Sequence, residues 1–340
     1  RLLGGLLGGA ALVALAGLVV LAFNHAEAVQ VGSTGVPSRF RGLGESANTA
    51  SLLFGVALPL ALWFVLRAPT ARARWLAVGT FVLLVGSIVA SGSRGALVGG
   101  FAGAAAAAFA AAESRGRRAG LIASLTALFI ASFYIGTLPK PLSHSAPTAV
   151  TAPATHPKPG YVDANVVYPL SDDIGRPVPG KGETFVGRQA FGSSGRTAAW
   201  RGALHQAEQR PTVGYGFGTE DHVFVNRYHT FAGGVPEDSY IGLLLQLGAV
   251  GLASFLAIVG WWLFRAAGSI RHLQGQARLT LAGAAGVVIA GLVAAIVQSY
   301  VVSVGDIATV TFWISGFVVA MLAWRASAVE KGPLGTEGNS

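Results

Sequence analysis

The sequence predicts an all-α protein that crosses a membrane several times, and three observations lead to this prediction. Of its 340 residues, 52% are hydrophobic and only 11% are charged, whereas soluble domains carry about 25% charged residues. Its mean hydropathy is +0.57. The apolar residues also gather in long runs, and a helix needs about 20 such residues to cross the hydrocarbon core.

These runs predict eight membrane spans. The stretch from Trp75 to Ala112 is far too long for one crossing at about 1.5 Å per residue, so we expect a helical hairpin that turns within residues 92–95. Arg94, at this turn, is the only charged residue of the stretch. The expected spans are residues 2–23, 47–66, 75–91, 95–112, 120–138, 239–264, 279–302 and 307–324.

The basic residues between the runs predict the orientation of the chain. Arginines and lysines occupy four segments that eight spans would place on one side: 67–74, 113–119, 265–278 and the tail. By the positive-inside rule this side is the cytoplasm. We therefore expect residues 1–138 to hold five spans, 139–238 to form a large external loop, 239–324 to hold three spans, and 325–340 to be a cytoplasmic tail.

The composition also argues against several kinds of partner. The net charge of the chain is +9. The basic residues lie between apolar runs, so membrane orientation explains them better than nucleic-acid binding does. Cysteine is absent and the seven histidines show no metal-ligand spacing such as HExxH. We expect no metal and no cofactor.

The external loop is expected to begin with an extended Pro- and Ser-rich stretch over residues 140–160. Later, residues 195–210 show helical periodicity, with Trp200, Leu204 and Ala207 on one face. A glycine-aromatic turn, TVGYGFGTE, follows this helix.

Several arginines lie on the expected external side, where the topology rule disfavours them. Guanidinium groups bind phosphate in a fork and stay charged, so arginines converging at the outer face would suit a lipid-linked phosphate or diphosphate. The set comprises Arg39, Arg41, Arg94, Arg188, Arg196, Arg201, Arg210 and Arg227.

Each arginine also has a plain structural interpretation. Arg94 could solvate the tip of a hairpin. Arg39 and Arg41 could bind headgroup phosphates without specificity, and Arg196 and Arg201 could be ordinary polar positions of an external helix. The hypothesis of a phosphate site depends on their occurring together.

Two adjacent carboxylates, Glu237 and Asp238, stand at the start of the sixth span. Carboxylates favour helix N-termini and Asp is a good N-cap. Partial burial could instead make one of them a general base, and both interpretations stay open. Asp306 is expected to cap the last span, and the other candidate bases are His205, His222 and His229.

The order of four motifs resembles the O-antigen ligase / Wzy polymerase superfamily of bacterial membrane glycosyltransferases. The motifs are RFRGLGESANTASLLFGVALPLAL, then SGSRGALVGG, then GRTAAWRGALHQAEQRPTVGYGFGTE, and finally EDSYIGLLLQLGAVGLASF. The resemblance runs from about residue 39 to residue 265. Since members of this superfamily have more helices than the eight expected here, the resemblance implies further spans ahead of Arg1.

The resemblance implies transfer of a glycan from an undecaprenyl-diphosphate carrier, without a metal, at the outer face of the bacterial inner membrane. The acceptor would be a glycolipid, a glycan or a protein. Arg94 and Arg196 would hold the diphosphate, with Arg39, Arg41 and Arg201 as further candidates. Arg196 would also act in catalysis by compensating the charge of the leaving group, and Glu237 or Asp238 would be the base.

One departure keeps several activities open. Ligases often carry His-Asn where this chain has Glu237 and Asp238, so a Wzy-type polymerase and a protein O-oligosaccharyltransferase remain alternatives. A transporter or flippase of lipid-linked glycans would be expected to carry charges within its spans. A structural or sensory protein would not need arginines near three span ends. The nearly charge-free spans favour an enzyme that works at one face.

Overall fold

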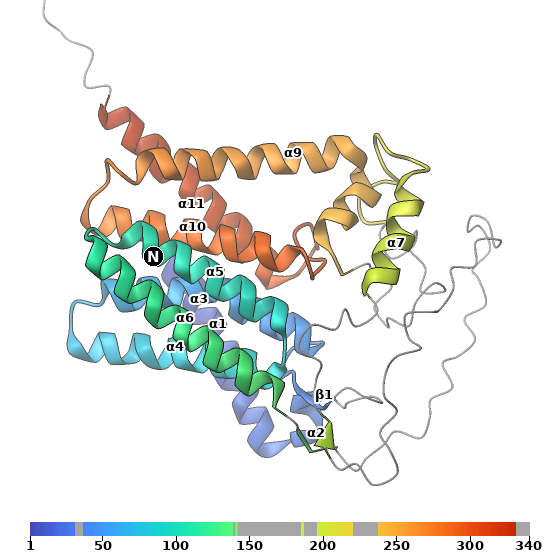
Figure 1. Ribbon diagram of the computed structural model, residues 1–340, viewed down its shortest axis with the longest axis horizontal. Helices are drawn as coiled ribbons and strands as arrows, with labels where there is room; N and C mark the ends of the chain where they lie inside the picture. Colours follow the sequence, from blue (N-terminus) through green and yellow to red (C-terminus); the bar gives the residue numbers. More distant parts are fainter. Residues whose placement is uncertain (31–36, 139, 142–184, 187–195, 220–236, 331–340) are drawn as a thin grey trace, which may run out of the picture.

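The computed structural model describes residues 1–30, 37–138, 140–141, 185–186, 196–219 and 237–330. Long helices form a bundle, and a short helix with its following turn lies beyond one end of it (Figure 1). In the part described, eight helices are long and apolar enough to cross a membrane. The predicted all-α, polytopic architecture is confirmed.

The eight long helices match the predicted spans closely. They are α1 (Leu2–Phe23), α3 (Ala47–Arg67), α4 (Ala71–Ser91), α5 (Arg94–Ala111), α6 (Arg115–Thr137), α9 (Ser239–Ser269), α10 (Gly275–Ala295) and α11 (Ile307–Glu330). The shorter elements are α2 (His25–Ala28), β1 (Val29–Gln30), β2 (Arg39–Phe40), β3 (Lys140–Pro141), β4 (Phe185–Val186) and α7 (Arg196–Ala207). Strand β1 pairs antiparallel with β2, and β3 with β4.

Three of the long helices begin with a side-chain cap from a serine or threonine. The side chains of Ser46, Thr70 and Ser114 each accept a hydrogen bond from a backbone N–H in the first turn of α3, α4 and α6. The predicted hairpin between α4 and α5 is confirmed: Gly92 ends α4 in a left-handed conformation and Arg94 opens α5.

Helix α3 lies at the centre of the bundle and is the most buried of the eight long helices. Helix α5 packs against α10 through small residues. A Cβ added at Gly103 would lie 2.3 Å from the carbonyl oxygen of Gly286, so only glycine allows the two backbones to approach this closely. Small residues serve the same purpose in membrane helix pairs generally.

The basic links gather at one end of the bundle, opposite α7 (Figure 1). At that end Arg278 donates from Nε to the carbonyl of Ala110 at 2.9 Å, and Arg118 donates to the carbonyl of Ala112 at 3.2 Å. These cations therefore satisfy the free carbonyls at the C-terminus of α5, where positive charge is favourable.

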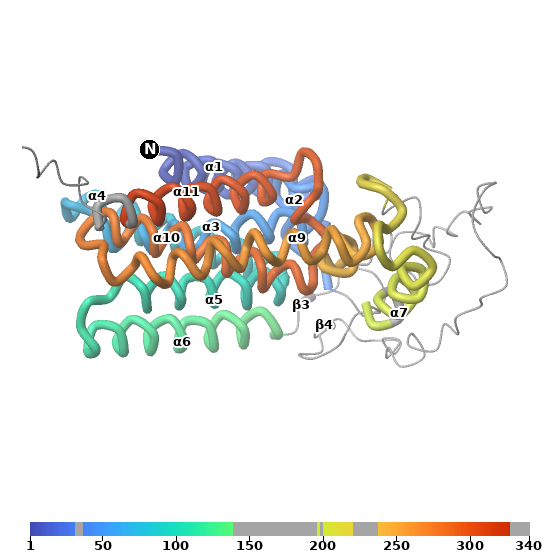
Figure 2. Tube along the Cα trace, turned by 90° about the horizontal axis from the view of Figure 1, so that it is seen from above, coloured from blue at the N-terminus to red at the C-terminus, as the bar shows by residue number. Residues whose placement is uncertain are grey.

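Helix α9 is broken at Gly248, whose φ of 63° lies in the left-handed region. The turn after α7 lies against the break. Tyr215 N donates to Leu245 O at 3.0 Å, and Ala249 N donates to Pro211 O at 2.7 Å. A Cβ at Gly248 would come within 2.3 Å of the Thr212 carbonyl. The turn TVGYGFGTE after α7 and the stretch around Gly248 in α9 are therefore in direct backbone contact. This contact holds α7 at the end of the bundle (Figure 2).

The seventh span differs from its prediction, because α10 ends at Ala295 and not near residue 302. The backbone N–H groups of Tyr300 and Val301 donate to the side chain of Ser239 instead of continuing the helix. The apolar residues after Ala295 thus form a loop against the start of α9.

Candidate functional site

Three arginines from distant parts of the chain converge at the end of the bundle near α7. They are Arg39 in β2, Arg94 at the start of α5, and Arg196 at the start of α7, and we call them the arginine cluster. Burial, together with the positive charges of Arg196 and Arg94, lowers the pKa of Arg39 to about 10, and the carboxylate of Glu237 acts in the opposite direction. Arg94 also lies within electrostatic range of Arg196. All three arginines of the cluster were predicted as site residues.

Arg39 is the most deeply placed member of the cluster, with only 8% of its surface exposed. Its Nε donates to the carbonyl of Ser91 at 2.6 Å, and its Nη2 donates to Asn48 Oδ1 at 2.6 Å. The first bond satisfies a carbonyl at the end of α4 and the second reaches the first turn of α3. Arg39 therefore fixes the hairpin that carries Arg94.

Arg196 forms an ion pair with Glu237. Its Nε and Nη2 approach the same carboxylate oxygen, Oε2, at 2.8 and 2.5 Å. Both side chains are mostly buried, with 15% and 20% of their surfaces exposed. A single carboxylate thus faces the arginine cluster in the described part of the chain.

The backbone of Glu237 is held in an unfavourable conformation. Its φ is 51°, and among the described residues no other non-glycine residue has a positive φ. The left-handed conformation costs a residue with a Cβ about 1–2 kcal/mol. Such strain persists where surrounding contacts impose it, often at functional sites; here the contacts are the pair with Arg196 and the helix start at Asp238.

Asp238 caps helix α9, as one of its two interpretations predicted. Its Oδ1 accepts hydrogen bonds from the N–H groups of Tyr240 and Ile241 at 2.8 and 3.0 Å, and its own N–H donates to Ser299 Oγ at 3.1 Å. Burial raises the pKa of the Asp238 carboxyl above its usual value, and the two N–H donors act in the opposite direction.

Two other predicted arginines lie apart from the cluster. Arg41 forms an ion pair with Glu27 at 2.9 Å, and its Nε donates to the Glu27 carbonyl at 2.8 Å. Arg201 is exposed on α7. Arg39 and Arg41 are only two residues apart in the sequence, but they have different partners in the structure.

The remaining candidates have different outcomes. His205 is exposed and lies 3.3 Å from Glu208. Asp306 caps α11 by accepting from Ala308 N at 2.8 Å, as predicted. Arg210 lies over the ring of Tyr215 at 4.9 Å. Residues outside the described part of the chain include the 142–160 stretch, Arg188, His222, Arg227 and His229.

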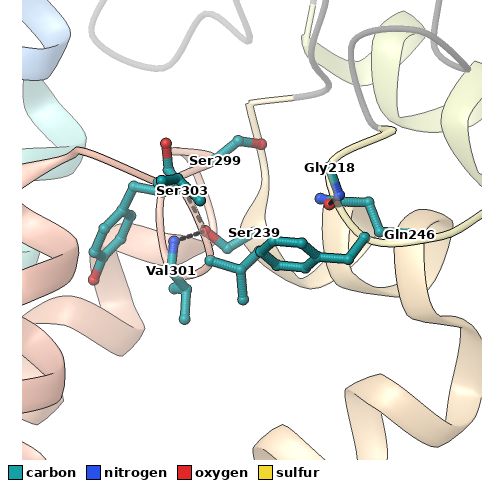
Figure 3. Close-up of a pocket in the computed structure, with 10 residues that line it drawn as sticks. Gly218, Ser239, Gln246, Ser299, Val301 and Ser303 are labelled. Carbon is teal, nitrogen blue, oxygen red and sulfur yellow. Dashed lines mark hydrogen bonds between the residues drawn. The ribbon is translucent and has the colours of Figure 1, made fainter.

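Sequence reasoning missed a polar neighbourhood beside Asp238. Ser239 Oγ donates to the Gln298 carbonyl at 2.6 Å. It also accepts from Tyr300 N and Val301 N at 3.0 and 3.3 Å (Figure 3). Gln246, buried within α9, accepts from Gly218 N at 2.8 Å. A polar side chain within an apolar span is itself a signal of function, so Gln246 was open to prediction, whereas nothing local marks Ser239.

A family model described as O-antigen ligase matches residues 79–256, just over half of the chain. The match covers Arg94, Arg196, Glu237 and the break in α9, and Arg39 lies ahead of it. A search of curated proteins returned no significant match. This multi-pass membrane protein therefore belongs to the O-antigen ligase family, within the superfamily that includes the Wzy polymerases.

Proposed function

We propose that this protein moves a glycan from an undecaprenyl-diphosphate carrier to an acceptor hydroxyl, at the outer face of the bacterial cytoplasmic membrane and without a metal ion. The family supports a glycosyltransferase of the O-antigen ligase or polymerase type. The observation that carries the finer proposal is the clustering of Arg39, Arg94 and Arg196, with the carboxylate of Glu237 paired to Arg196.

The charge of this cluster suits a diphosphate. Arg196 pairs with Glu237, and Arg39 lies within electrostatic range of that carboxylate and of Arg196 and Arg94. Among these four described side chains the guanidinium groups therefore outnumber the carboxylate. Arginine binds phosphate oxygens in pairs of parallel hydrogen bonds. Fixed positive groups directed at a leaving group whose charge grows in the transition state supply about 10²–10³-fold of rate each. We assign this role to Arg94 and Arg196, with Arg39 supporting it from within the protein.

The proposed reaction is a single displacement. The acceptor oxygen attacks the anomeric carbon as the bond from that carbon to the diphosphate oxygen breaks. The hydroxyl proton passes to a carboxylate of the protein, and undecaprenyl diphosphate leaves as the anion with the bonding electron pair. Attack from the face opposite the diphosphate inverts the anomeric centre.

Glu237 is the better candidate for the base. Asp238 uses one carboxylate oxygen to cap α9, whereas Glu237 reaches into the arginine cluster. In the free protein its carboxylate occupies the anion position on Arg196. We propose that the diphosphate of the donor displaces it, so that the base becomes available only once the donor is bound.

The orientation of the site is also part of the proposal. The arginine cluster lies at the end of the bundle opposite the basic links (Figure 1), which the positive-inside rule places in the cytoplasm. The chain has no cysteine, so a single Val213→Cys substitution at an exposed residue after α7 gives a unique thiol. A membrane-impermeant maleimide should label it in intact cells. Labelling only after the membrane is opened would reverse the orientation.

A reconstituted system tests the activity. The protein in proteoliposomes, supplied with an undecaprenyl-diphosphate oligosaccharide and EDTA, should transfer the oligosaccharide to one of three acceptors: a glycolipid, a second oligosaccharide or a protein. The acceptor used distinguishes the ligase from the polymerase and the protein O-oligosaccharyltransferase. Movement of the donor across the bilayer with no new glycosidic bond would instead identify a flippase, and activity lost to EDTA would remove the metal-free mechanism.

A further inference from the structure

A pocket of about 390 Å³ lies between the break in α9 and the loop that joins α10 to α11 (Figure 3). Ligand pockets of proteins commonly measure about 300–1,000 Å³. The pocket is lined by Phe217, Gly218, Ser239, Gln246 and the six residues 299–304, and none of these side chains carries a charge.

The lining is neutral and mixed in character. Hydroxyls come from Ser299 and Ser303, and an amide comes from Gln246. The Ser239 hydroxyl makes its hydrogen bonds within the protein and only shapes the wall. The ring of Phe217, 57% exposed, adds an apolar surface. Donors and acceptors beside an apolar surface match a sugar ring, which has hydroxyls at its edge and C–H groups on its faces. A phosphate would require cations, and an acyl chain would require an apolar lining.

The walls of the pocket are held in place by hydrogen bonds. Gly218 N donates to Gln246 Oε1 at 2.8 Å, which fixes the turn after α7 to α9. Ser239 accepts from the backbone of Tyr300 and Val301, which fixes the opposite loop to the start of the same helix. A site formed in advance in this way loses little freedom when it binds a ligand.

The pocket is also next to the proposed chemistry. Ser299, in its lining, accepts a hydrogen bond from Asp238 N at 3.1 Å, and Asp238 directly follows Glu237 in the chain. A sugar in the pocket would therefore lie close to the start of α9, where Glu237 and Asp238 stand. We infer that this pocket is a subsite for an uncharged sugar residue of the transferred or accepting glycan, an inference that rests on the proposed function.

Cysteine accessibility tests the subsite, because the chain has no cysteine of its own. Ser303→Cys and Phe217→Cys each place one thiol in the pocket wall, and Val213→Cys places a control thiol at an exposed residue that is not part of the lining. Maleimide alkylation rates are measured in proteoliposomes with three additions. These are undecaprenyl diphosphate, the undecaprenyl-diphosphate oligosaccharide of the source membranes, and glycolipids from the same membranes freed of lipid diphosphates.

A ligand that covers the thiol at ten times its dissociation constant slows alkylation about tenfold. We expect this protection at one or both pocket positions from a sugar-bearing addition, and none from undecaprenyl diphosphate or at position 213. Protection by the lipid-linked oligosaccharide assigns the subsite to the donor, protection by the glycolipids assigns it to the acceptor, and protection by both means that either glycan can enter.

Two results would overturn the inference: no protection at either pocket position, or equal protection by undecaprenyl diphosphate. Glycan transfer by the wild-type protein is measured in the same vesicles. Transfer without protection removes the subsite and leaves the proposed function standing. Protection without transfer supports a sugar-binding pocket and removes the proposed function.

Discussion

Glu237→Gln is expected to slow glycan transfer while strengthening the binding of undecaprenyl diphosphate. A missing general base lowers the rate about 10²–10⁴-fold. The free protein also loses the carboxylate that competes for Arg196 at 2.5–2.8 Å, so the diphosphate no longer has to displace it. Initial transfer rates give the first effect, and competition by undecaprenyl diphosphate against the donor gives the second.

Asp238→Asn is the matched control for this experiment. Asparagine caps helices about as well as aspartate, so the bonds to Tyr240 N and Ile241 N should survive and activity should stay near that of the wild type. If Asp238→Asn abolishes transfer and Glu237→Gln does not, the base is Asp238. Weaker binding of undecaprenyl diphosphate by Glu237→Gln would contradict the idea that Glu237 occupies the anion position.

Arg94→Ala should reduce transfer by about 10²–10³-fold, the usual effect of removing one fixed group that stabilises developing charge. Arg94 opens α5 at the hairpin tip and faces the charges of Arg39 and Arg196. The loss should appear in kcat and in kcat/KM for the donor, because a leaving-group contact is strongest in the transition state. Arg94→Lys should recover only part of the rate, since an ammonium lacks the planar fork.

Arg41→Ala provides the control for Arg94→Ala, because Arg41 pairs with Glu27 apart from the cluster. It should change transfer by no more than a few-fold, within the modest worth of an exposed ion pair. Arg39 is a poorer choice for this test, since removing it also breaks the bonds to Ser91 and Asn48. Equal transfer by Arg94→Ala and the wild type would remove Arg94 from the clamp.

The sequence predicted the features that depend on local chemistry. Apolar run length predicted the spans, and glycine and serine predicted the α4–α5 turn. Position predicted the cap at Asp306 and one of the two interpretations of Asp238. It predicted the arginines of the site only as a set. Choosing Arg39 over Arg41 requires the Ser91 carbonyl, which lies 52 residues along the chain, and periodicity carries no information about such a contact.

The features that the sequence did not predict also depend on contacts between residues that are far apart in the chain. The loop after Ala295 is as apolar as a helix end, and only its bonds to Ser239 keep it out of the helix. The break in α9 depends on the turn at Pro211 meeting Gly248 from outside the helix. Both the loop and the break form only where two segments far apart in the sequence meet. At these positions tertiary contacts override the local propensity for helix.

The anchoring of Gly218 to Gln246 and of Asp238 to Ser299 gives residues 219–237 two fixed ends on the bundle. A change in the length of a chain segment that is held at both ends costs little, because each doubling adds only about 0.6 kcal/mol of closure entropy. An insertion or deletion in the middle of this stretch therefore leaves α7 and the start of α9 where they are.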